Sequence, residues 1–246
     1  MDCGHQYPTD QIIYTCSVCG GLLDVQHDLD TLRTSINRTT FDDRLGTLER
    51  PYNSGVWRYK ELVYPDVADD LIVSRPEGNT NLYDSPRLAS WVGVNKLYLK
   101  HEGENPTGSF KDRGMTVAIS KAAEAGAKAV VCASTGNTSA SAAAYAVKAG
   151  MTAVVLVPQG KIAMGKLAQA IVMGSRLLQV DGNFDQCLRL ARELADNYPV
   201  ALVNSVRMVW PFNSRLTALT AMARSSRSPL EKRRNTGTRR ASSRSH

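Results

Sequence analysis

The sequence predicts an α/β fold built on a parallel sheet, and three observations support this fold class. Short apolar runs rich in β-branched residues recur about every 25 residues in the second half of the chain. Longer helix-like segments separate these runs, and a glycine follows each of the first three helix-like segments. Buried strands that alternate with helices form βαβ crossovers and a parallel sheet. We therefore expect a small three-layer α/β domain.

The repeat begins with KDRGMTVAISKAAEA, residues 111–125, which predicts a helix that ends at the following glycine. The run KAVVCAS over 128–134 is short and β-branched, and it predicts a buried strand. Small residues dominate SASAAAYAVKA over 139–149, where we expect a second helix. The run TAVVLVP over 152–158 predicts a second buried strand.

The second part of the repeat follows the same order. The segment KIAMGKLAQAIVM over 161–173 predicts a helix, and RLLQV over 176–180 predicts a third buried strand. The segment FDQCLRLARELADN over 184–197 is amphipathic and predicts another helix. The run VALVNS over 200–205 predicts the fourth strand of the sheet.

Composition divides the chain into four segments. Residues 1–26 are rich in Cys and Gly and predict a small cap. Residues 27–100 lack a long period and contain the strand-like KLYLK. The regular α/β repeat occupies 101–206. Residues 207–246 have no sustained period and are dominated by Arg and Ser, so we expect a disordered tail or an abnormal sequence.

The basic charge of the chain is concentrated in that last segment. Residues 207–246 hold nine Arg and one Lys against a single acid. The whole chain has 30 basic and 23 acidic residues, which leaves 20 and 22 for the first 206 residues. The tail has two aromatic residues, both far from its Arg-rich end. We therefore expect no nucleic-acid partner, although Arg-rich segments can neutralise phosphates.

The sequence favours a cytoplasmic protein. It has no apolar run near the roughly 20 residues that cross a bilayer, so we expect no membrane partner. Its start, MDCGHQYPTD, shows neither a basic nor an apolar signal region. The cysteines are odd in number, which argues for reduced thiols and against a disulfide framework. They are Cys3, Cys16, Cys19, Cys132 and Cys187.

Lys111 stands out in the stretch HEGENPTGSFKDRGM, residues 101–115. Pro and Gly predict a turn before it, and Ser109 is a candidate N-cap that would place Lys111 in the first helical turn. The positive end of the helix dipole disfavours an ammonium there, and a neutral amine is the form that attacks a carbonyl. The alternative is a surface lysine paired with Glu104 or Asp112.

A second polar motif follows the first expected strand. The turn STGNTS, residues 134–139, places hydroxyls and amides at the carboxyl end of a parallel strand and before a helix. Anions and small ligands bind at such positions in open α/β sheets. The alternative is helix capping by Ser134, Thr135 or Thr138. Two such turns, one with a lysine, favour a binding site.

Together these motifs resemble a known family. NPTGSFKDRGM, followed about 20 residues later by ASTGNTSAS, resembles the pyridoxal-phosphate enzymes of the tryptophan-synthase β-subunit fold. Within this group the chain is most similar to the threonine synthases. EGNT at 77–80 resembles a loop of the family, and YTCSVCGGLLDV is similar to the Cys-rich cap of many threonine synthases. The resemblance covers residue 1 to about residue 206.

The resemblance implies a role for each matching side chain. Lys111 would form the internal Schiff base with pyridoxal 5'-phosphate, and Phe110 would help to hold the cofactor ring. Asn137 would donate a hydrogen bond to the phenolic oxygen of the ring. The residues implied to bind the carboxylate of a small amino-acid substrate are Ser134, Thr135, Asn137 and Thr138.

The resemblance also implies an architecture and a reaction. Residues 101–206 would be the small domain of a two-domain enzyme, and 27–100 the N-terminal part of the large domain. The implied reaction converts O-phospho-L-homoserine and water to L-threonine and phosphate. A related dehydratase or β-replacement enzyme, or an inactive fragment that only binds ligands or partners, is the alternative. A homodimer is the assembly considered for such an enzyme.

The N-terminal cysteines form half of a zinc ribbon. CSVC at 16–19 has the spacing of two zinc ligands, and a full ribbon needs a second pair. Cys3 could join Cys16 and Cys19, with His5 as a fourth ligand. A metal-free knuckle with free thiols is an equal alternative.

Two parts of the implied enzyme are not found. No Gly-rich loop matches the family's phosphate-binding loop, and no Ser or Thr of 207–246 matches the residue beside the pyridine nitrogen. We expect that the chain leaves the family's reading frame just after Val206 and that most of the large domain is missing. A one-sided sheet exposes apolar surface, so we expect the isolated chain to be poorly soluble and weak or inactive.

Overall fold

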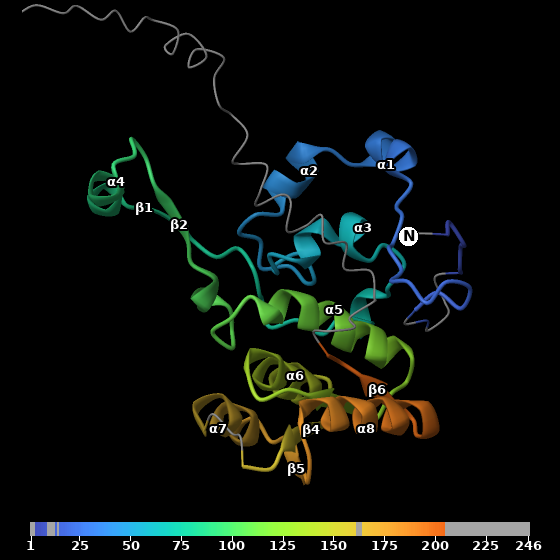
Figure 1. The fold of residues 1–246 in the computed structure, drawn as a ribbon. Helices are drawn as coiled ribbons and strands as arrows, with labels where there is room; N and C mark the ends of the chain where they lie inside the picture. Colours follow the sequence, from blue (N-terminus) through green and yellow to red (C-terminus); the bar gives the residue numbers. More distant parts are fainter. Residues whose placement is uncertain (1–2, 9–12, 14, 161–163, 205–246) are drawn as a thin grey trace, which may run out of the picture. The chain divides into compact units, whose positions relative to one another are not determined.

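A computed structural model describes residues 3–8, 13, 15–160 and 164–204 of the chain (Figure 1). All described residues lie within one compact unit of the chain. The expected boundary at Val206 and the expected tail lie outside the described residues. Within the described part, none of the helices combines the length and hydropathy that crossing a bilayer requires.

A four-stranded parallel sheet forms the centre of the α/β repeat, as expected. Its strands are β3 (Ala129–Ala133), β4 (Thr152–Pro158), β5 (Arg176–Val180) and β6 (Val200–Leu202), in the order β5-β4-β3-β6. All three neighbouring pairs are parallel, with Cys132 opposite Val155 in the central pair. This order puts β3 and β4 in the interior and β5 and β6 at the edges.

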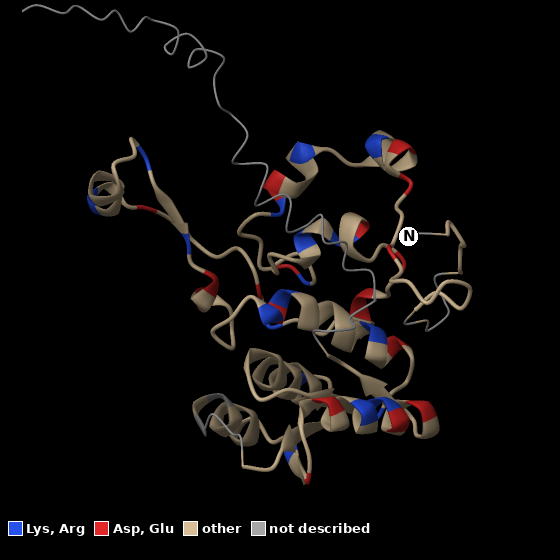
Figure 2. Cartoon of the chain, in the orientation of Figure 1, with Lys and Arg blue, Asp and Glu red and all other residues tan. Residues whose placement is uncertain are grey.

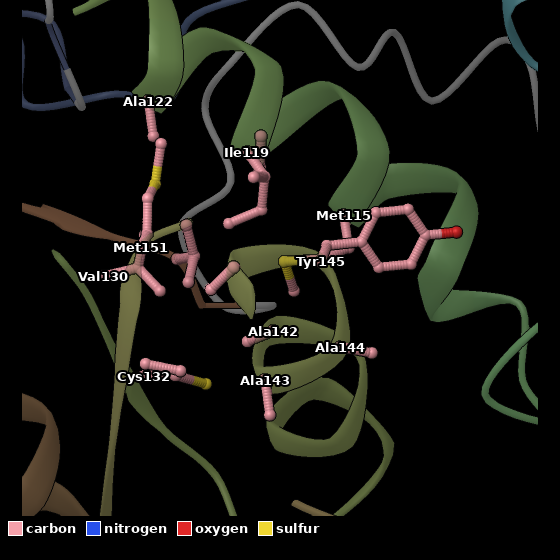
Figure 3. Packing of buried hydrophobic residues seen from close by; sticks show 14 of the residues in the cluster. Met115, Ile119, Ala122, Val130, Cys132, Ala142, Ala143, Ala144, Tyr145 and Met151 are labelled. Carbon is pink, nitrogen blue, oxygen red and sulfur yellow. The ribbon is translucent and has the colours of Figure 1, made fainter. Parts of the chain in front are cut away.

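Four helices cover the sheet: α5 (Lys111–Glu124), α6 (Asn137–Lys148), α7 (Met164–Val172) and α8 (Phe184–Asn197). Because successive residues of a strand face opposite sides, β3 contributes to two cores. Val130 and Cys132 pack with α5 and α6, and Figure 3 shows these side chains converging. Val131 and Ala133 pack with α8 on the other face. The three-layer α/β prediction is confirmed.

The composition of α6 and α8 reflects their positions. Every residue of α6 from Thr138 to Ala146 is buried, and its single charged residue, Lys148, stands at its end. α8 buries only Cys187, Leu188 and Ala191. Figure 2 shows acidic and basic residues along the remainder of α8. The small-residue helix α6 is therefore packed on nearly all sides, whereas the amphipathic helix α8 has one face on the sheet and one face in solvent.

One part of the strand prediction is wrong. β5 was expected to be buried, but its residues are exposed or half-buried, and Leu178 is 47% exposed. The reason is its position, since β5 pairs only with β4 and forms an edge of the sheet. A short apolar run predicts a strand and does not tell an edge from the interior.

The segment before α5 holds short elements only. They are α1 (Leu29–Ser35), α2 (Arg38–Asp43), η1 (Trp57–Tyr59), α3 (Lys60–Val63), η2 (Asp69–Leu71), β1 (Leu82–Asp84), α4 (Pro86–Val92), β2 (Tyr98–Lys100) and η3 (Glu102–Glu104). The strand-like KLYLK contains β2, which pairs antiparallel with β1. That expectation is confirmed.

Hydroxyl groups on α5 hold this earlier segment. The indole Nε1 of Trp57 donates to the Thr116 hydroxyl at 2.7 Å, and that hydroxyl donates to the Val73 carbonyl at 2.7 Å. The Val73 N–H donates to the Ser120 hydroxyl at 2.8 Å. α5 thus contacts the apolar core through one face and fixes residues 57–73 through another. Its position is determined from both sides.

A buried carboxylate fixes the next stretch. Glu77 is fully buried and accepts hydrogen bonds from the hydroxyls of Ser54 at 2.5 Å and Tyr145 at 2.7 Å. The backbones touch here as well, since a Cβ at Gly55 would lie 2.1 Å from the nitrogen of Asn79. Burial, together with the charge of Glu77, raises the pKa of Tyr145. Glu77 therefore ties three distant segments together.

We predict that Tyr145→Phe lowers the free energy of unfolding by about 1–3 kcal/mol, because the buried Glu77 carboxylate loses a donor while the ring volume is kept. Chemical denaturation monitored by circular dichroism measures the change. The matched control is Tyr198→Phe, whose side chain is 62% exposed and should change stability by less than about 0.5 kcal/mol. Equal stability of the two variants would contradict the assigned role of Glu77.

Candidate functional site

Lys111 is the first residue of α5 and is half-buried. Its expected place in the first helical turn is confirmed. The helix cap differs by one residue from the prediction: Phe110 already has a helical backbone and is the N-cap. The Ser109 hydroxyl instead accepts a hydrogen bond from the N–H of Lys111 at 3.3 Å.

The ion-pair alternative for Lys111 is wrong among the described residues. Asp112 is directed to Thr107 and Ser141, and Glu104 accepts hydrogen bonds from Asn81. The recorded contact of the Lys111 Nζ is the ring of Phe110, with 4.8 Å between Nζ and the ring centroid. The amine thus lies beside an aromatic face that is half exposed.

The predicted polar turn lies between β3 and α6. Gly136 is the N-cap of α6, and no side chain among the described residues caps this helix. The Ser134 hydroxyl accepts a hydrogen bond from the Gly136 N–H, outside the helix. The capping alternative for Ser134, Thr135 and Thr138 is therefore wrong. The first N–H groups of α6 remain available as donors to a ligand.

A single bridge brings the two motifs together. The Ser141 hydroxyl donates to Asp112 Oδ1 at 2.5 Å, and Asp112 follows Lys111 in α5. Asn137 lies four residues before Ser141, so both are on one face of α6. Burial raises the pKa of the Cys132 thiol to about 12, and the nearby Lys111 ammonium opposes this effect. The bridge therefore ties the helix that begins with Lys111 to the helix that begins with Asn137, and Lys111 is near enough to β3 to act on Cys132.

The amide of Asn137 offers a direct test of fit to a cofactor. Its Oδ1 is buried and has no hydrogen-bond partner among the described residues. Buried polar atoms in proteins usually have a hydrogen-bond partner, so the Asn137 side chain has the capacity to bind a polar group of a ligand. Rotation of the amide by half a turn would present the Nδ2 donor at the same place. The site thus has a lysine amine without an ion pair, an aromatic face and an unsatisfied amide, which fit pyridoxal phosphate.

Sequence reasoning missed two buried acids. In the sequence, Asp112 suggests only a surface partner of Lys111, and Glu77 stands only within a family-like loop. Both are fully buried and accept several hydrogen bonds. The sequence does hold an indication of this burial. Several Ser and Thr residues stand near each acid, and a buried carboxylate needs such hydrogen-bond donors.

The N-terminal cysteines form a compact cluster. The Sγ atoms of Cys3, Cys16 and Cys19 all lie within 4.8 Å of one another. The hydroxyl of Tyr7 donates to the Cys16 Sγ at 3.3 Å, and this bond, together with backbone hydrogen bonds from Cys19 and Val18, lowers the pKa of Cys16 to about 6. No histidine or carboxylate of the described residues joins the cluster, and the His5 ring contacts Tyr7 instead.

Known proteins share both the sequence and the fold. A threonine synthase of Methanosarcina acetivorans is 48% identical over 206 residues, which are 84% of this chain and 48% of the relative. A threonine synthase of Mycobacterium tuberculosis is 58% identical over 162 residues, which are 65% of this chain and 44% of the relative. The chain therefore spans about half the length of these curated relatives.

A solved structure supports the fold alone. The apo form of Escherichia coli diaminopropionate ammonia lyase matches this chain with a TM-score of 0.50 and 19% sequence identity. The matched region is 64% of this chain and 51% of the lyase chain. The family model described as pyridoxal-phosphate dependent enzyme matches residues 73–221. This match includes Lys111, Asn137 and the whole parallel sheet, and it covers more than half of the chain. The chain belongs to the family of pyridoxal-phosphate dependent enzymes.

Proposed function

We propose that this chain is part of a threonine synthase, a lyase that converts O-phospho-L-homoserine and water to L-threonine and phosphate. The observation that carries the proposal is a bridge between two helices. Lys111, without an ion pair among the described residues, begins α5, and the Asp112–Ser141 hydrogen bond ties α5 to α6, which begins with the unsatisfied amide of Asn137. The threonine synthases that share 48% and 58% of their aligned residues with this chain support the choice of reaction.

In this proposal Lys111 and Phe110 would hold pyridoxal phosphate, Lys111 through its amine at the cofactor aldehyde and Phe110 through its ring. Asn137 binds the phenolic oxygen of the ring. When bound, pyridoxal phosphate supplies an electron sink for carbanions at the substrate. The Lys111 amine, once released by the substrate, moves protons at Cα and Cβ.

The turn after β3 binds the amino-acid substrate. We assign its carboxylate to the first N–H groups of α6 and to the side chains of the turn. The uncapped start of α6 supports this assignment, because the positive end of a helix dipole favours an anion. The side chains assigned to the carboxylate are Ser134, Thr135, Asn137 and Thr138.

We predict that the chain with added pyridoxal phosphate shows the visible absorbance band of a lysine Schiff base and that Lys111→Ala abolishes it. The matched control is Lys148→Ala, an exposed lysine at the end of α6, which should keep the band. Persistence of the band in Lys111→Ala, or its absence in the unmodified chain, would contradict the proposed role of Lys111.

Substrate assays separate the proposed reaction from its alternatives. Phosphate release from O-phosphohomoserine, without keto acid from serine or threonine, is the result expected for a threonine synthase. Keto acid from serine or threonine would favour a dehydratase on the same fold. A Schiff-base band with no turnover of any of the three substrates would indicate a fragment that only binds ligands.

For the N-terminal cluster we propose a structural zinc ion held by Cys3, Cys16 and Cys19. The closeness of the three thiols supports it, because zinc takes thiolates in a tetrahedral arrangement. After dialysis the chain should retain about one zinc ion, and Cys16→Ser should retain much less. Cys187→Ala, outside the cluster, should keep the metal. Equal zinc content in all three proteins would overturn the site.

We propose that the enzyme is cytoplasmic and acts on a small amino acid, without a membrane or nucleic-acid partner. We also propose that it assembles as a homodimer. Large apolar side chains exposed on β1, α4 and β2 support an interface; Trp91, for example, is 81% exposed. Sedimentation equilibrium tests the assembly, and a monomer at all concentrations would contradict it.

A further inference from the structure

Asp112 is a fully buried acid beside the reactive lysine. Its Oδ2 accepts a hydrogen bond from the Thr107 N–H at 2.6 Å. Its Oδ1 accepts from the Thr107 hydroxyl at 2.6 Å and from the Ser141 hydroxyl at 2.5 Å. None of the ion pairs among the described residues involves Asp112. Its carboxylate is satisfied entirely by neutral donors.

These contacts join three elements. Thr107 belongs to the turn before Lys111, and its carbonyl also accepts a hydrogen bond from Gln169 of α7 at 3.1 Å. Asp112 stands one residue after Lys111 in α5, and Ser141 stands one turn after Asn137 in α6. The carboxylate therefore links the turn, the lysine helix and the asparagine helix within one hydrogen-bonded group.

The chemistry of the group requires an acceptor. An ionised carboxylate only accepts hydrogen bonds, so it suits three donors that converge on it, whereas an amide would direct its own N–H₂ at some of them. Bonds to a charged acceptor are shorter and stronger than neutral ones. An apolar residue here would leave the Thr107 N–H and the hydroxyls of Thr107 and Ser141 without their acceptor, which is unfavourable for buried donors. What the carboxylate adds is a fixed position of Thr107 and Ser141 relative to α5.

We propose that Asp112 is a positioning residue, which holds Lys111 at the distance and direction from Asn137 that the cofactor link needs. This inference rests on the proposed Schiff base at Lys111. Asp112 itself touches neither cofactor nor substrate and acts through the turn and the two helices. The link forms when the Nζ of Lys111 attacks the cofactor aldehyde and water leaves.

The test compares two variants at one position. Thr107→Val keeps the shape of the side chain and removes the hydroxyl that donates to Asp112, whereas Thr107→Ser keeps that hydroxyl. Each protein is incubated with pyridoxal phosphate and reduced with borohydride, and the label at Lys111 relative to Lys148 is measured by mass spectrometry. We expect a ratio on the order of tenfold lower in Thr107→Val and Asp112→Asn, and an unchanged ratio in Thr107→Ser.

A variant that is merely less stable could also show a lower ratio of label at Lys111 to label at Lys148, so a destabilised control is needed. Leu156→Val shortens a fully buried side chain in the core on the α8 face of the sheet, away from α5, and serves as the destabilised control, which should keep the ratio. If Asp112→Asn does not fold, the comparison of Thr107→Val with Thr107→Ser tests the positioning role by itself. Unchanged ratios in folded Thr107→Val would overturn the positioning role. Absence of label at Lys111 in the unmodified chain would instead overturn the proposed cofactor link itself.

Discussion

The site depends on one constraint, the packing of α5 from two sides. Met115 and Ile119 contact the core that α6 and the sheet share, while Thr116 and Ser120 hold the segment from Trp57 to Val73. A helix fixed along both faces has one place for its first residue. The two-sided packing therefore fixes the position of Lys111, and a fixed amine is what the proposed role of Lys111 requires.

Two buried carboxylates extend this constraint to the loops around the site. Glu77 connects Ser54 and Tyr145, and Asp112 connects Thr107 and Ser141 (distances of 2.5–2.7 Å). Buried charges that lack a partner are strongly unfavourable, so each carboxylate holds its donors in place. The Asn137 amide oxygen, at the first residue of α6, stays buried without a hydrogen-bond partner among the described residues.

Much of this arrangement could be predicted from local pattern. The strands and helices of the repeat, and the place of Lys111 at a helix start, follow from periodicity and glycine positions. Contacts between distant residues could not be predicted in this way. The Glu77–Tyr145 bond joins residues 68 positions apart, and the exposure of β5 depends on strand order. Asp112 was misread because one acid beside one lysine suggests an ion pair, whereas its donors lie at 107 and 141.

A crystal structure of the chain with pyridoxal phosphate tests the central claim most directly, that the two-sided packing of α5 presents Lys111 and Asn137 to one cofactor. We predict continuous density from the Nζ of Lys111 to the cofactor, with the Asn137 amide in hydrogen-bonding contact with its ring. The positions of Thr107, Asp112 and Ser141 should be unchanged. Cofactor bound to another lysine, or ordered away from Asn137, would contradict the account.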